Sequence, residues 1–119
     1  MIKEGLAAQT MKERDREIIL EFKRRLTSDI RNQVKTLIVF GSRARGEERE
    51  DSDLDIIALV TDKTPDIEKK LEDIAYTVMW DYDFKPIITL KVFAESQFND
   101  ASTRGFSFYK HVEKEGIPV

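Results

Sequence analysis

The sequence predicts an α/β (α+β) fold in which helices pack mainly on one face of a small mixed β-sheet. Segments with apolar residues at three- and four-residue steps alternate with short apolar runs rich in β-branched residues. The expected order is helix, strand, strand, helix, strand, helix, with no internal repeat and no low-complexity tract. Because 119 residues can bury one hydrophobic core, we expect residues 1–119 to form a single domain.

The first helix is expected over residues 11–33, where one apolar stripe runs along an otherwise charged surface. The stripe consists of Ile18, Ile19, Phe22, Leu26 and Ile30. Two strands follow, over residues 34–40 and residues 53–61. The first of them is a nearly unbroken apolar run, which indicates burial on both faces, and Gly41 ends it.

The second helix has a clear start signal in the sequence. Thr64 has the side chain of an N-cap, Pro65 suits the first helical position, and Asp66 places a negative charge in the first turn. We expect this helix to run to about Trp80, because apolar residues recur along one of its faces.

The third strand and the last helix complete the expected fold. The strand covers residues 83–93, and Pro86 within it cannot donate a ladder hydrogen bond, which indicates an edge or bulged strand. The helix covers residues 103–115, and Gly116 and Pro118 end it.

Composition excludes several classes of function. Without cysteine the chain has no disulfide scaffold and no Cys nucleophile, and a single histidine, His111, rules out a multi-His metal site. No apolar run approaches the roughly 20 residues of a membrane span, and the first residues lack the apolar stretch of a secretion signal, so we expect a cytoplasmic protein. The 20 basic residues are outnumbered by 23 acidic ones, which argues against direct nucleic-acid binding.

Groups suited to phosphate binding are concentrated where the first strand ends. Gly41 has no Cβ, so the backbone can approach a ligand closely there. If a short helix begins at Ser42, its first N–H groups form an anion site, to which the Ser42 hydroxyl adds a donor. Arg43 and Arg45 supply guanidinium groups that match phosphate oxygens. These four residues are the predicted nucleotide-binding residues.

A pair of carboxylates follows at the start of the second strand. Asp53 and Asp55 are two residues apart, so their side chains leave one face of the strand, while Leu54 and Ile56 face the core. Close carboxylates repel each other unless a cation lies between them. Mg²⁺ takes one or two carboxylates together with substrate phosphates, and a two-metal site has its ions about 4 Å apart. Asp53 and Asp55 are therefore the predicted catalytic and metal-binding residues of a nucleoside triphosphate site.

Each part of this pattern also has an ordinary structural explanation. Gly-Ser occurs in many turns, and Asp-x-Asp occurs at many strand starts and helix caps. From average residue usage, the two together at one fixed spacing arise by chance in roughly one chain of this size in several hundred. The combination, rather than either part, favours the nucleotide site.

Gly41-Ser42, ten further residues and Asp53-x-Asp55 together resemble the signature of the DNA polymerase β-like nucleotidyltransferase superfamily. The surrounding Gly-Ser-Arg-Ala-Arg-Gly and Ser-Asp-Leu-Asp resemble its minimal nucleotidyltransferase (MNT) branch, and only residues 40–59 carry the specific likeness. The resemblance implies a polymerase β-like fold and Mg²⁺-dependent transfer of a nucleoside monophosphate, AMP from ATP by default, to an acceptor hydroxyl. Members of this branch commonly pair with a HEPN-domain protein and act as the antitoxin that adenylylates a toxic ribonuclease.

The chain departs from the family pattern at one position. The family usually has a third carboxylate on a later strand that faces the first two, but the interior of the expected third strand contains no acid. Asp83 at the entry of that strand is the best substitute and is the predicted third metal ligand, with Asp81 and Glu95 behind it. The alternative for Asp81 and Asp83 is a surface turn.

The leading hypothesis is an Mg²⁺- and NTP-dependent nucleotidyltransferase that modifies a HEPN-type partner. The alternative is a non-catalytic nucleotide-binding module that neutralises its partner by direct contact, which an absent third carboxylate would favour. Transfer to a small molecule, as in aminoglycoside-modifying relatives, ranks lower because those enzymes usually carry an additional acceptor-binding domain. The base, the acceptor, the number of nucleotides transferred and any homo-oligomer stay open.

Overall fold

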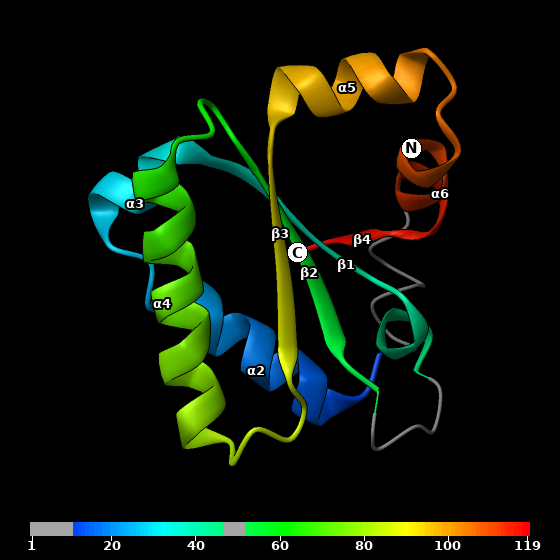
Figure 1. The fold of residues 1–119 in the computed structure, drawn as a ribbon. Helices are drawn as coiled ribbons and strands as arrows, with labels where there is room; N and C mark the ends of the chain where they lie inside the picture. Colours follow the sequence, from blue (N-terminus) through cyan, green and yellow to red (C-terminus); the bar gives the residue numbers. More distant parts are fainter. Residues whose placement is uncertain (1–10, 47–51) are drawn as a thin grey trace.

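The structure is a computed structural model that describes residues 11–46 and 52–119 (Figure 1). Five α-helices, one 3₁₀ turn and four strands lie within these residues. In chain order they are α2 Glu13–Arg24, α3 Ser28–Gln33, β1 Val34–Phe40, η1 Ser42–Arg45, β2 Leu54–Val60, α4 Pro65–Asp81, β3 Ile88–Ala94, α5 Glu95–Thr103, α6 Ser107–Glu115 and β4 Ile117–Pro118. None of the described helices is long and apolar enough to span a membrane.

The four strands form one mixed sheet in the order β3-β2-β1-β4. Strand β1 is antiparallel to both β2 and β4, whereas β2 and β3 run parallel. The central strand β2 is almost wholly buried, as its apolar sequence Leu-Asp-Ile-Ile-Ala-Leu-Val requires. The predicted mixed sheet is confirmed.

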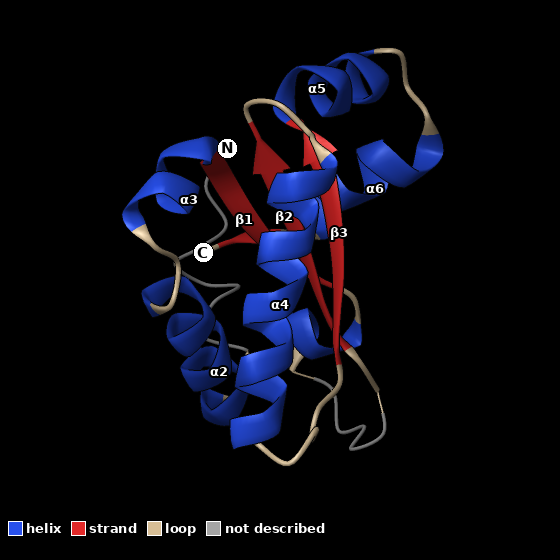
Figure 2. Cartoon of the chain, turned by 60° about the vertical axis from the view of Figure 1, so that its left-hand side comes forward, coloured by secondary structure: helices blue, strands red, loops and turns tan. Residues whose placement is uncertain are grey.

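The helices divide unequally between the two faces of the sheet (Figures 1 and 2). Helices α2, α3 and α4 cover one face and contribute to the larger core, which includes Phe22, Leu71 and Val78. Helices α5 and α6 pack on part of the opposite face through a smaller cluster of Ile38, Ile57, Leu59, Phe98 and Val112. The expectation that helices lie mainly on one face is confirmed, and the smaller cluster leaves the rest of the second face to the site described below.

Two helices differ in extent from the prediction. The segment expected as one helix over residues 11–33 breaks at Thr27, whose backbone is extended (φ −71°, ψ 166°). That break turns α3 so that Ile30 also reaches the core. The helix expected over residues 103–115 begins only at Ser107, because Gly105 has a left-handed backbone (φ 84°) that separates it from α5. Helix α5 and the short strand β4 were not predicted.

The third strand begins later than expected. Residues Asp83 and Phe84 adopt left-handed backbone conformations (φ 59° and 56°), so the chain turns there and β3 starts at Ile88. Strand β3 lies at the edge of the sheet, as predicted, although Pro86 lies before the strand rather than within it. Helix α4 begins as predicted, with the Thr64 hydroxyl accepting a hydrogen bond from the Ile67 N–H at 3.1 Å.

Candidate active site

The two motifs of the sequence meet at one end of the sheet. In the antiparallel ladder between β1 and β2, Phe40 pairs with Asp55, so Gly41 and Ser42 follow directly beside the start of β2. Strand β3 begins at the same end, because it runs parallel to β2 and Leu54 pairs with Ile88. The end of β1 and the starts of β2 and β3 therefore form one rim.

Gly41 lets the backbone pass directly against a carboxylate. Its φ is +89°, and a Cβ built on it would lie only 2.7 Å from Oδ2 of Asp55. Any other residue would meet both the backbone strain and this contact. The approach of the Gly41 backbone to a ligand stays a prediction, and the group that this backbone approaches within the chain is Asp55.

The predicted short helix after Gly41 is a single 3₁₀ turn, η1. The Ala44 N–H donates to the Gly41 carbonyl at 3.2 Å and the Gly46 N–H donates to the Arg43 carbonyl at 3.2 Å. Ala44 is buried and anchors the turn, whereas Ser42 is half-buried at its first position and Arg45 is exposed. Ser42 and Arg45 therefore lie in the turn that directly follows β1, and their contacts with phosphate stay predictions.

The described contacts of Arg43 are with Asp15 and with the Ser52 backbone. Its Nη1 donates to both carboxylate oxygens of Asp15 on α2, at 2.9 and 3.2 Å, and its Nε donates to the Ser52 carbonyl at 2.8 Å. Asp15 is only 1% exposed, so its charge depends on this partner. The phosphate contact predicted for Arg43 stays a prediction, and in the structure this guanidinium joins α2 to η1 and to the segment that enters β2.

Asp53 and Asp55 lie on the same face of β2, as predicted, with Leu54 and Ile56 buried on the other. Burial raises the pKa of Asp55, the neighbouring charge of Asp53 raises it further, and the charge of Lys91 opposes both effects. The pair is therefore costly to hold fully ionised without a cation. Among the described residues no group of three or more acidic or histidine side chains is placed to hold a metal, so these two carboxylates stand as a pair.

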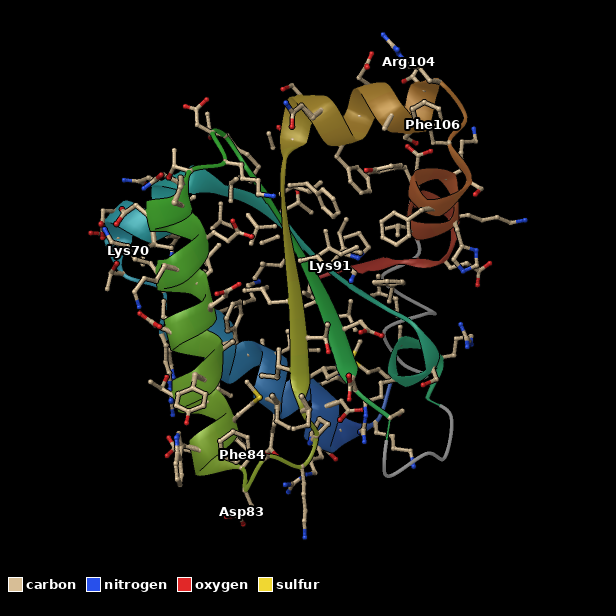
Figure 3. All side chains as sticks on the ribbon, viewed as in Figure 1. Lys70, Asp83, Phe84, Lys91, Arg104 and Phe106 are labelled. Carbon is tan, nitrogen blue, oxygen red and sulfur yellow. The ribbon has the colours of Figure 1, made fainter. Side chains whose placement is uncertain are left out.

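The position facing this pair from β3 holds a hydroxyl. Thr89 is the register partner of Asp55, and its Oγ1 donates to Oδ2 of Asp53 at 2.9 Å. Two residues further on, Lys91 lies on the same face of the sheet, on the side of β3 away from α4 (Figure 3). Neither residue was predicted to belong to the site, although strict alternation along β3 places both side chains on one face.

The acids proposed as a third ligand lie away from the pair. Asp83 is exposed in the left-handed turn after α4, and its side chain points outward at the edge of the molecule (Figure 3). Asp81 at the end of α4 forms an ion pair with Arg25. Glu95 begins α5, beyond the opposite end of β3. Asp83 is not included in the proposed metal site, because the turn directs its side chain into solvent.

Comparison with known families supports this geometry. The model of the nucleotidyltransferase domain family matches residues 16–110, which span both motifs and all of β3. The chain belongs to the nucleotidyltransferase domain family. It is also 35% identical over 92 residues to "Putative protein adenylyltransferase MJ0141" of Methanocaldococcus jannaschii, an alignment that covers 75% of this chain and 93% of that protein. No solved structure gave a significant match.

Because the family match includes both motifs, the rim where they meet is the part of the chain whose role should be tested. The match confirms the family resemblance read from Gly41-Ser42 and Asp53-x-Asp55, and the mixed sheet agrees with the polymerase β-like fold. The family match and the archaeal relative thus support a nucleotidyltransferase.

The contact between Gly41 and Asp55 predicts a measurable coupling in stability. Gly41→Ala should lower the free energy of unfolding by about 1–3 kcal/mol from backbone strain, with a further loss from the displaced carboxylate. In an Asp55→Ala background that further loss should disappear, as a urea-unfolding double-mutant cycle would reveal. Gly105→Ala is the control, since its φ is +84° but no atom lies within 4 Å of the new Cβ. Equal costs of Gly41→Ala in both backgrounds would contradict the contact.

The raised pKa of Asp55 predicts a pH dependence of stability in metal-free buffer. A carboxyl whose pKa is higher in the folded state contributes stability at acid pH and loses that contribution as pH rises through the folded-state pKa. Asp55→Asn should therefore gain stability relative to the parent protein as pH rises, and the difference should narrow when Asp53→Asn is also present. Urea unfolding between pH 4 and pH 8, with a chelator present, measures this. A difference that stays constant with pH would show that Asp55 is neither desolvated nor repelled.

Proposed function

We propose that this nucleotidyltransferase transfers a nucleoside monophosphate, AMP from ATP, to a hydroxyl of a partner protein in an Mg²⁺-dependent reaction. The observation that carries the proposal is the pair Asp53 and Asp55 on one face of β2, with the Gly41 backbone directly against Asp55. Two carboxylates that can bind a cation, and a backbone segment that a ligand can approach closely, therefore lie together at the rim.

The donor set at the rim suits Mg²⁺. Two carboxylates that repel each other, one of them half-buried with a raised pKa, gain from a divalent cation between them. Mg²⁺ is commonly held by one or two carboxylates and completes its coordination with substrate phosphates and water. When bound, Mg²⁺ would supply charge neutralisation of the triphosphate and of the attacking oxygen, in a one- or two-ion site.

The reaction itself requires little covalent chemistry from the protein. The acceptor oxygen forms a bond to the α-phosphorus, the bond from that phosphorus to the bridging oxygen breaks, and pyrophosphate leaves with the electron pair. The acceptor proton passes to water or to one of the two carboxylates. Gly41 and Ser42 would hold the triphosphate, and Asp53 and Asp55 would hold its counter-ions, so that positioning and charge supply the acceleration.

Lys91 offers the site a cation besides the guanidinium of Arg43. It is exposed on the same face as Asp53 and Asp55, and its charge acts on Asp55. An ammonium at this position can contact a phosphate of the bound nucleotide, as a point charge without the fixed fork of a guanidinium. Arg45, exposed on η1, remains a second proposed phosphate contact.

The archaeal relative and the family resemblance both support a protein as the acceptor. The archaeal relative is named as a protein adenylyltransferase, which supports ATP as donor and a protein as acceptor. The MNT-like residues of the 40–59 segment support a HEPN-domain partner and an antitoxin role. The alternative stays a non-catalytic module that neutralises the partner by contact, and the neutral Thr89 opposite Asp55 is the observation that favours it.

Transfer of label from ATP tests the proposal. The purified protein is incubated with α-labelled ATP, Mg²⁺ and a candidate HEPN-domain partner encoded beside it. Label should reach the partner with the parent protein and be lost with Asp53→Asn and with Asp55→Asn, since each removes a metal ligand, while exposed Asp62→Asn serves as the matched control. Absence of label together with Mg²⁺-dependent ATP binding, and neutralisation retained by Asp53→Asn, would replace transfer by the contact mechanism.

The role of Lys91 predicts a change in ATP binding rather than in chemistry. Lys91→Ala should raise the KM for ATP about tenfold, the size of one charge-assisted hydrogen bond, with a smaller effect on kcat. Lys91→Arg keeps the charge and should retain most of the affinity. Lys69→Ala, on the exposed surface of α4, is the control. An unchanged KM for ATP in Lys91→Ala would remove Lys91 from the site.

A further inference from the structure

Thr89 on β3 faces the two carboxylates, and its side chain makes one specific interaction with them. The Thr89 hydroxyl donates to Oδ2 of Asp53 at 2.9 Å, across 36 residues of sequence. We infer that Thr89 is a positioning residue that fixes the Asp53 carboxylate for cation binding. This inference rests on the proposed function, because it assigns a task within the same site.

Asp53 needs such a support because its surroundings otherwise leave it free to rotate. It is exposed and lies one residue before β2 begins, whereas Asp55 is half-buried within the strand. The backbone beside Asp53 is fixed, since the Leu54 N–H donates to the Ile87 carbonyl at 2.8 Å. The side chain, however, has only the hydroxyl of Thr89 to select one of its rotamers among the interactions of the described residues.

Thr89 is well suited to direct a hydroxyl. A β-branched side chain in a strand has a restricted χ1, so its hydroxyl has a nearly fixed direction. Donation to Oδ2 uses one acceptor site of the carboxylate and leaves Oδ1 and the remaining lone pairs for a cation. A carboxylate in the same place would repel Asp53 instead of holding it.

The two carboxylates are therefore held from opposite sides. Strand β3 holds Asp53 through Thr89, and the end of β1 confines Asp55 through the Gly41 backbone. With a neutral residue at position 89, the two carboxylates bring at most two negative charges to the rim. The hydrogen bond from Thr89 orients Asp53, and it takes the place of the third negative charge that a carboxylate at this position would bring.

Metal binding without turnover tests the inference. The amount of free Mn²⁺ is measured by electron paramagnetic resonance as the full chain is titrated, in the presence of a non-hydrolysable ATP analogue. Thr89→Val, which keeps the shape and removes the donor, should weaken Mn²⁺ binding about tenfold, the lower end of what one hydrogen bond to a charged group contributes. Thr89→Ser restores the hydroxyl and should restore most of the affinity.

The controls separate a positioning role from a merely structural one. Thr36→Val changes a half-buried strand threonine on β1 in the same way and should leave Mn²⁺ binding unchanged. A structural role for Thr89 would lower the free energy of unfolding and leave Mn²⁺ affinity intact, which would overturn the inference. Thr89→Ala provides a second donor-free variant if valine is not accommodated.

The same titration distinguishes the two proposals. Loss of Mn²⁺ binding in Asp53→Asn and Asp55→Asn, with normal binding in Thr89→Val, would overturn the role of Thr89 and leave the metal site standing. Unchanged Mn²⁺ binding in both aspartate variants would overturn the proposed metal site itself. In label-transfer assays, Thr89→Val should raise the Mg²⁺ concentration needed for half-maximal rate more than it lowers kcat.

Discussion

The ion pair between Arg43 and Asp15 holds together the pieces from which the rim is built. Asp15 belongs to α2, Arg43 belongs to η1, and the Ser52 carbonyl that also accepts from Arg43 leads into β2. A carboxylate that is 1% exposed is stable only with such a partner, so the three segments are fixed relative to one another. The position of Gly41-Ser42 beside Asp53 depends on this pair.

The basic residues in and around the rim therefore have different roles. One guanidinium of the Gly-Ser-Arg-Ala-Arg-Gly segment stabilises the framework, while Arg45 on η1 and Lys91 on β3 are exposed. The buried apolar strand β2 gives Asp53 and Asp55 a rigid base, and each carboxylate has a different neighbour. A cation and a triphosphate would thus meet groups whose positions are already set, which is the condition for electrostatic acceleration.

The sequence predicts those features that depend on neighbouring residues and misses those that depend on pairing across the chain. Strand β1, the start of α4 at Thr64 and the common face of Asp53 and Asp55 all follow from local pattern and were confirmed. The bond from Arg43 to Asp15 and the register of Thr89 with Asp55 join segments 28 and 34 positions apart, which no local pattern specifies. Asp83 was misplaced because a turn, rather than a strand, occupies its position.

The parallel pairing of β2 with β3 has a consequence for how the protein acquires its activity. Asp55 meets Thr89 only after α4 has crossed over the sheet and brought β3 to the outer edge of β2. Closing so long a connection costs chain entropy before any contact compensates it, so parallel strands tend to pair late in folding. During synthesis, a chain that has reached only the end of α4 would carry the Gly-Ser turn and both carboxylates without the strand that completes the rim. The candidate site would therefore be complete only once the edge strand has docked.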